Sequence, residues 1–169
     1  MNTWIVLLRA VNVGGTGKLP MAELRAMCEG IGFEDVRTYI ASGNVVLRSA
    51  HGGKQVKALL EKELARYAGK PVGVLVRTPE EMAAVLATNP FPDAAPNRNV
   101  VVFLDLAPAS DTLATVSHRN GEEIALGRRE IHIHYGEGMA DSKLSIPAAK
   151  SGTARNMNTV ARLVGMARE

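Results

Sequence analysis

A glycine-rich segment follows the first apolar run of the chain and is the first candidate for chemistry. Residues 12–18 read Asn-Val-Gly-Gly-Thr-Gly-Lys. A phosphate-binding P-loop requires a glycine, four residues and then Gly-Lys-Ser/Thr. Counting back from Lys18 places that first glycine on Asn12 and the required hydroxyl on Leu19. The dinucleotide fingerprint G-x-G-x-x-G also fails, because its third glycine falls on Pro20. Both nucleotide motifs are therefore excluded.

Two interpretations of this loop remain open. A glycine-rich turn that leads into a helix exposes unpaired amides at the positive end of the helix dipole, which suits an anion. Alternatively, the glycines only permit a tight turn between a strand and a helix. The residues that would form the anion site are Arg9, Asn12, Gly14, Gly15 and Lys18.

A serine and an asparagine flank a second glycine, in the stretch Ser42-Gly43-Asn44. The G-x-S-x-G motif of a serine nucleophile is absent, and no base is evident beside Ser42. Turn chemistry accounts for this composition. The alternative is that Ser42 and Asn44 line the same cleft as the loop that begins at Asn12.

Two histidines, His132 and His134, alternate on a predicted strand, so both imidazoles point to one face. A metal site needs at least a third ligand, and His51 and His118 are distant in sequence. We therefore expect cross-strand packing or surface exposure, and neither a metal nor a cofactor.

Polar residues also gather near the end of the chain. A helix predicted to start near Thr153 would carry Arg155, Asn158, Thr159 and Arg162 on a stripe opposite its apolar face. This stripe is either a solvated helix face or, together with Asn156 and the preceding Ser142, Lys143 and Lys150, a hydrogen-bonding cluster for a phosphate or carboxylate. We predict that this region lies beside the loop that begins at Asn12.

Apolar spacing predicts which elements position these residues. Residues 1–78 follow the order β-α-β-β-α-β, the split βαβ or ferredoxin-like arrangement. Its strands are predicted at residues 4–11, 36–40, 44–48 and 72–77, and its helices at residues 20–31 and 53–69.

A smaller part with strands and helices is predicted for the second half. Thr78-Pro79-Glu80-Glu81 is a helix start, with a capping threonine and a proline at the first helical position. A proline-rich connector covers residues 89–96. The fold class is thus α+β, divided into a ferredoxin-like subdomain at residues 1–78 and an α+β subdomain at residues 79–169. Further strands are predicted at residues 99–106, 122–126 and 130–135, and a short helix at residues 110–117.

Composition and charge narrow the range of functions. The chain has 169 residues and a formal charge of 20 − 17 = +3, which favours anionic partners only weakly, because the basic residues are not clustered. Its single cysteine, Cys28, lies in an apolar helical pattern, so we expect a buried, inert thiol. No apolar run approaches the length of about 20 residues that spans a membrane, and no basic leader precedes the first strand. We therefore expect a cytoplasmic protein with no membrane partner.

Several blocks of the sequence together resemble one family. They read Leu-Arg-Ala-Val-Asn-Val-Gly-Gly at residues 8–15, Lys-Leu-Pro-Met at 18–21, Tyr-Ile-Ala-Ser-Gly-Asn-Val at 39–45, Asn-Pro-Phe at 89–91, Gly-Met at 138–139, Ser-Lys-Leu at 142–144 and Thr-Ala-Arg-Asn-Met-Asn-Thr-Val at 153–160. In this order they are similar to the domain of unknown function 1697 family. Met157 departs from the tryptophan usual there, which weakens the idea of an aromatic platform. The resemblance implies a ferredoxin-like first portion and an α+β second portion, and it implies no activity.

Three hypotheses for function follow. The first is binding of an anionic ligand (a nucleotide, another phosphate-bearing small molecule or a nucleic acid) in a cleft between the two subdomains. With only Trp4 and Tyr39 as aromatics on the predicted sheet, a small phosphate-bearing ligand is favoured over RNA. The second is an enzyme of unknown reaction that uses the same basic cleft, and the third is a protein-interaction module without a ligand. The proposed ligand-binding residues are Arg9, Asn12, Gly14, Gly15, Lys18, Ser42, Asn44, Lys143, Arg155, Asn156 and Asn158.

Overall fold

The computed structural model describes residues 1–11 and 18–169. Its contacts divide the chain into two compact units. The first unit comprises Met1–Ala83 together with Leu163–Glu169, and the second comprises Ala84–Arg162. The fold class is α+β, as predicted, because each unit is built on a four-stranded antiparallel sheet. The division predicted after residue 78 stays a prediction.

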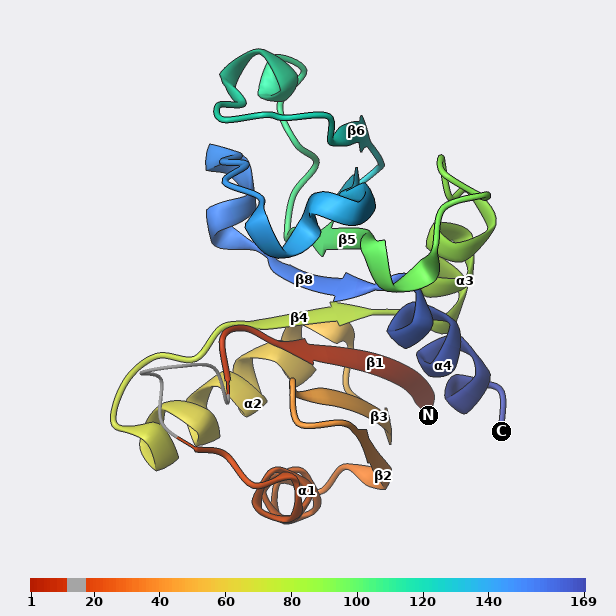
Figure 1. Ribbon diagram of the computed structural model, residues 1–169. Coiled ribbons are helices and arrows are strands. Elements are labelled where there is room, and N and C mark those ends of the chain that lie inside the picture. The colour runs from red at the N-terminus through yellow and green to blue at the C-terminus, as the bar shows by residue number, and fades with distance from the viewer. Residues whose placement is uncertain (12–17) are drawn as a thin grey trace. The chain divides into compact units, whose positions relative to one another are not determined.

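The first unit contains a sheet with two helices on one of its faces (Figure 1). The strands lie in the order β2-β3-β1-β4, and all neighbours are antiparallel. Residues 4–11 were predicted as one strand, but β1 already ends at Leu8 because Ala10 has a positive φ of 55°. The elements are β1 (Asn2–Leu8), α1 (Met21–Ile31), β2 (Glu34–Tyr39), β3 (Asn44–Ser49), α2 (Gly53–Ala68), β4 (Val74–Arg77) and α3 (Pro79–Ala87), which extends past the unit boundary.

The core of the first unit forms between its sheet and the helices α1 and α2. Val6, Leu8 and Val45 of the sheet meet Leu24 of α1 and Leu60 of α2 there. Residues Ile5 to Leu8 are all 0% exposed, so β1 is buried on both faces, as its nearly continuous apolar sequence predicts. A central strand of this kind fixes the register of its neighbours, because a slip by one residue would reverse every side chain.

The second unit repeats this strand order with shorter connections. Its strands lie in the order β6-β7-β5-β8, so the first strand of the unit is again flanked by its third and fourth. Its core contains Val102, Ile131, Ile133 and Ile146. The elements are η1 (Pro96–Arg98), β5 (Asn99–Phe103), η2 (Thr112–Thr115), β6 (Glu123–Leu126), β7 (Glu130–His134), η3 (Gly136–Asp141), η4 (Pro147–Ser151), β8 (Thr153–Asn156) and α4 (Met157–Ala167), which continues into the first unit.

One predicted element is wrong. Thr153–Asn156 is the edge strand β8 and not the first turn of the last helix, which begins at Met157. The apolar spacing of Met157, Val160 and Val164 does not extend back to Thr153. Pairing of Arg155 with Val101 of β5 places the segment in the sheet instead.

Capping interactions fix the start of α3 and the end of α4. The Thr78 hydroxyl accepts the Glu81 N–H at 3.0 Å and the Glu81 carboxylate accepts the Thr78 N–H at 2.9 Å, which confirms the predicted helix start. At the end of α4, the Arg37 guanidinium donates to the Met166 carbonyl at 2.8 Å. It also contacts the Glu169 carboxylate at 3.2 Å. A cation there complements the negative end of the helix.

The turn between β2 and β3 depends on Gly43. Its φ is +89°, and its carbonyl accepts the Leu8 N–H at 2.8 Å. A Cβ at this position would lie 2.8 Å from both the Leu8 Cβ and the Val11 Cγ2. Both the backbone conformation and the close approach to β1 therefore require glycine.

We expect Gly43→Ala to lower the free energy of unfolding by about 2–4 kcal/mol, from the left-handed backbone and the clash together. Gly69→Ala is the matched control, because Gly69 has φ +71° but nothing within 4 Å of its added Cβ. In the control, the free energy of unfolding should fall by only about 1–2 kcal/mol. Urea denaturation measures both losses, and equal losses would contradict the steric argument.

Candidate functional site

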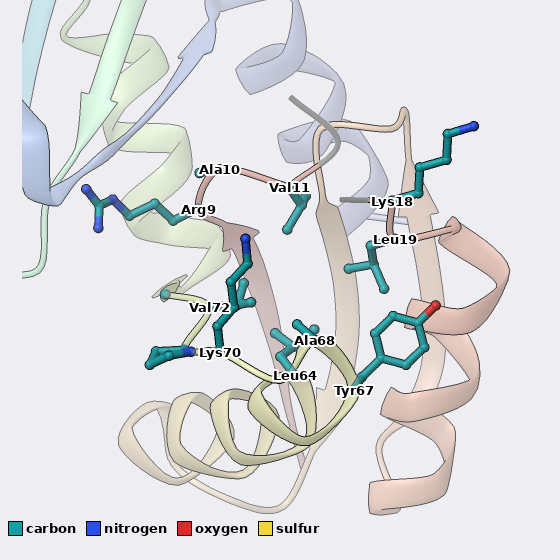
Figure 2. A pocket seen from close by; sticks show the side chains of 12 residues that line it. Arg9, Ala10, Val11, Lys18, Leu19, Leu64, Tyr67, Ala68, Lys70 and Val72 are labelled. Atoms are coloured by element: carbon teal, nitrogen blue, oxygen red, sulfur yellow. The ribbon is translucent and has the colours of Figure 1, made fainter. Parts of the chain in front are cut away.

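A hollow at the end of β1 is the candidate site, and it lies entirely within the first unit (Figure 2). Its volume is about 370 Å³, within the range of small-molecule sites. We call it the basic hollow. Its lining residues are Arg9, Ala10, Val11, Lys18, Leu19, Leu64, Tyr67, Ala68, Lys70, Pro71, Val72 and Gly73.

Strand pairing and helix ends position the three cations of the basic hollow. Arg9 follows β1 directly, and its N–H donates to the Gly73 carbonyl at 2.9 Å. Lys70 follows Gly69, whose left-handed φ of +71° ends α2. Lys18 lies shortly before α1. All three side chains are exposed, and Arg9 and Lys18 extend away from each other while Lys70 lies between Arg9 and Leu64 in the view of Figure 2.

The electrostatic balance of the basic hollow is positive. No aspartate or glutamate is among the described residues that line it, and within residues 1–11 and 18–169 neither Lys18 nor Lys70 forms an ion pair. The C-terminal end of α2 opposes this with a partial charge of about −0.5. The full positive charges of Lys18 and Lys70 alone outweigh that half charge, so the basic hollow favours an anion.

Most of the other lining residues are apolar, so the basic hollow also offers a surface for an apolar part of a ligand. Leu64 and Ala68 of α2 form one wall, and Figure 2 shows Val11 and Leu19 facing them. Val72 lines the side that leads into β4, and the half-exposed Tyr67 lies beside Leu19. A ligand with an anionic group and an apolar part would find complementary surface for both.

Ser42 and Asn44 have a structural role in the turn between β2 and β3. Asn44 is 0% exposed, and its amide donates to the Tyr39 carbonyl and to the Ser42 hydroxyl, each at 2.9 Å. This is the turn chemistry that the sequence predicts. Neither residue is among those that line the basic hollow.

Arg155 does not lie on a helix, contrary to the prediction. It belongs to β8, is 7% exposed, and donates to the Thr153 hydroxyl at 2.7 Å and the Ala154 carbonyl at 2.9 Å. Burial lowers the pKa of its guanidinium to about 10. The predicted polar stripe of the last helix therefore lacks its first member.

The other predicted residues of the second unit occupy different surroundings. The Asn156 side chain accepts the Thr159 N–H at 3.0 Å and caps α4. Asn158 lies in the first turn of α4 and Lys143 follows η3, and both are exposed.

The predicted residues of the glycine-rich loop, Asn12, Gly14 and Gly15, lie outside the described residues. The predicted contact of this loop with the Arg155 region stays a prediction for the same reason.

Sequence reasoning missed Lys70 and Tyr67 as site residues. Tyr67 follows Leu60 and Leu64 at helical spacing within the helix predicted at residues 53–69, which favours burial, although it is 48% exposed. The signal for Lys70 was the predicted strand order, in which the start of the fourth strand lies beside the end of the first. Because β4 pairs antiparallel with β1 from Leu8–Val74 onward, residues just before β4 must lie beside Arg9.

The histidines and the cysteine do not form a chemical centre in the described chain. His132 is 3% exposed, and burial lowers the pKa of its imidazole. His134 contacts the Glu123 carboxylate at 2.9 Å. Cys28 is 0% exposed, which confirms the predicted buried thiol, and burial raises its pKa to about 12. Among residues 1–11 and 18–169, no three His, Cys, Asp or Glu side chains are grouped closely enough to hold a metal ion. The helices of the same residues are too short or too polar to cross a membrane.

A buried carboxylate holds the segment that precedes Lys143. Glu122 is 3% exposed and accepts hydrogen bonds from the Ser142 hydroxyl and the Asn120 N–H. The Ser142 hydrogen bond is the main cause of a lowered Glu122 pKa, with a further contribution from the Asn120 N–H. Glu122 thus fixes where the Ser142–Lys143 segment lies on the second unit.

Removal of the cap at Asn156 should lower stability. We expect Asn156→Ala to lower the free energy of unfolding by about 1 kcal/mol, because the Thr159 N–H loses its acceptor. Asn156→Asp keeps an acceptor and should retain most of that stability. Urea denaturation distinguishes the two, and an equal loss in both variants would contradict the capping role.

Removal of the Ser142 hydroxyl should change the pH dependence of stability. A carboxyl pKa that is lower in the folded state stabilises the protein above its unfolded value of 4.5, and this contribution disappears as the pH falls through the folded pKa. Ser142→Ala should therefore raise the Glu122 pKa, and its stability deficit should shrink between about pH 7 and pH 3.

Urea denaturation across that pH range and an NMR titration of the Glu122 carboxyl measure both effects. The control is Ser151→Ala, which removes a hydroxyl that donates to the Ala148 carbonyl at 3.3 Å and contacts no carboxylate among the described residues. The loss in the free energy of unfolding caused by Ser151→Ala should not change with pH. If the loss caused by Ser142→Ala is equally independent of pH, the role of Glu122 is contradicted.

Comparison with known proteins shows the fold and the family. The chain is similar to the solved structure of the conserved bacterial protein SP0830 from Streptococcus pneumoniae, with a TM-score of 0.79 and 24% sequence identity over 98% of each chain. No curated protein matches the sequence.

The family described as "Protein of unknown function (DUF1697)" matches residues 1–132, which is more than half of the chain. The match confirms the resemblance found in the sequence blocks. The chain therefore belongs to the DUF1697 family of proteins of unknown function.

Proposed function

We propose that the protein binds a phosphate-bearing small molecule in the basic hollow. The observation that carries this proposal is the combination of Arg9, Lys18 and Lys70 with an apolar wall and no acidic residue in the described lining. Residues 12–17, which precede Lys18 in the sequence, carry no charge. The overall charge of +3 favours the same class of ligand.

The chemistry of the lining supports binding more than catalysis. Among the described residues around the basic hollow there is no carboxylate, imidazole, thiol or aliphatic hydroxyl, and Tyr67 supplies the only phenol. Most general acid–base and nucleophilic catalysis uses such groups within hydrogen-bond reach of the ligand. A lysine amine can also serve, but it is activated by desolvation, and Lys18 and Lys70 are both exposed. The size of the hollow favours a small molecule over a nucleic acid strand, which would need a groove along several nucleotides.

We also infer that the first unit has the ferredoxin-like arrangement. The element order β1-α1-β2-β3-α2-β4 and the antiparallel order β2-β3-β1-β4 support this inference. In this arrangement the end of β1 and the start of β4 are neighbours, so the basic hollow lies where two chain connections meet.

Inorganic pyrophosphate is the probe for the anionic half of the proposal. Lys70→Ala and Lys18→Ala should each weaken its binding about five-fold, because one exposed charge contributes up to roughly 1 kcal/mol. The matched control is Lys62→Ala, which removes an exposed lysine of α2 that does not line the basic hollow. Binding should also weaken as the salt concentration rises.

Calorimetric titration gives the affinities, and amide chemical shifts in an NMR titration locate the probe. Shifts should concentrate at residues 9–11 and 64–73. A loss with Lys62→Ala equal to that with Lys70→Ala, or shifts confined to the second unit, would contradict the proposal. Tighter binding of a short single-stranded RNA than of pyrophosphate would favour a nucleic acid instead.

A further inference from the structure

Tyr67 is shared by two neighbouring hollows of the first unit. It lines the basic hollow, and it also lines a second hollow of about 480 Å³ between α1 and α2. We call the second one the α1/α2 groove. In Figure 2 the Tyr67 ring stands between the end of α2 and the start of α1, beside Leu19. The ring thus forms a wall that both hollows have in common.

The α1/α2 groove continues the apolar surface past this wall. One side of it is a stripe of α1 at helical spacing, formed by Ala26, Met27, Gly30 and Ile31. Met27 and Ile31 pack against the core of the unit. Gly30 has nothing within 4 Å of an added Cβ, so the floor beside it is open.

The charges of the two hollows differ in sign. The α1/α2 groove is bordered by Glu23, Glu63 and Arg66. Arg66 and Glu63 pair at 2.9 Å and compensate each other. Glu23 then leaves the groove negative, while the basic hollow carries three cations. An anionic group is therefore attracted to one side of Tyr67 and repelled from the other.

We propose that Tyr67 sets the length of the ligand that the basic hollow accepts. The ligand has an anionic head at Arg9 and Lys70 and a short apolar body along Leu64 and Val72, which ends against the Tyr67 ring. This assignment rests on the proposed function of the basic hollow. Tyr67 is a specificity-determining residue, because removal of its ring joins the basic hollow to the α1/α2 groove and admits a longer apolar body.

A series of n-alkyl phosphates from methyl to dodecyl tests this assignment by calorimetric titration. Each added methylene that becomes buried should tighten binding about four-fold, which corresponds to roughly 0.8 kcal/mol. In the wild-type protein the improvement should stop at the chain length that reaches Tyr67. In Tyr67→Ala it should continue to longer chains, so the longest phosphates should bind the variant at least ten-fold more tightly.

Tyr67→Phe is the matched control, because it keeps the ring and removes only the hydroxyl. Its affinity should stop improving at the same alkyl chain length as that of the wild type. The same stopping length in all three proteins, or an unbroken improvement in the wild type, would overturn the role of Tyr67.

Failure of the proposed function has a different signature. In that case even the short phosphates would bind the wild type no more tightly than they bind Lys70→Ala. If Lys70→Ala weakens the binding of alkyl phosphates, but the affinity stops improving at the same chain length in the wild type and in Tyr67→Ala, the role of Tyr67 alone would be overturned.

Discussion

The end of β1 is the constraint on which the first unit depends. Two backbone hydrogen bonds hold it, from the Leu8 N–H to Gly43 and from the Arg9 N–H to Gly73, at 2.8 and 2.9 Å. Ile5 to Leu8, the second half of the strand, are all 0% exposed, so the strand cannot shift without exposing apolar side chains on both faces. The chain leaves this fixed point through Ala10, with φ +55°. The place of Arg9 on the rim of the basic hollow follows from the register of the sheet.

The same constraint determines how the basic hollow can bind. Its cations are exposed and stand at chain connections, so each contributes little alone. Its apolar wall is firmer, because Leu64 is 1% exposed and belongs to the core of the unit. Specificity in such a site therefore comes from the shape of the apolar part, while the cations set orientation and the rate of encounter.

Much of the fold could be predicted from the sequence, because apolar periodicity reports burial directly. The spacing of Val56, Leu60 and Leu64 predicts α2, and all three side chains are buried against the sheet. The prediction failed at residues 153–156, where four residues are too few to show a period. Pairing with β5, which is distant in sequence, decides their conformation. Local pattern carries no information about such a partner.

The candidate site was predictable only in part, for a related reason. Arg9 and Lys18 flank a conspicuous glycine-rich segment, and local composition singles them out. Lys70 and Tyr67 stand in unremarkable surroundings and reach the same hollow only through the antiparallel pairing of β4 with β1. Conversely, Asn44 and Asn156 attract notice as polar residues beside turns, yet their amides satisfy backbone groups at 2.9 and 3.0 Å. Polar side chains near chain reversals first serve the unpaired groups of the backbone. Candidate ligand contacts in this fold are therefore better sought among side chains that no turn or helix end requires, and Lys70 is one of these.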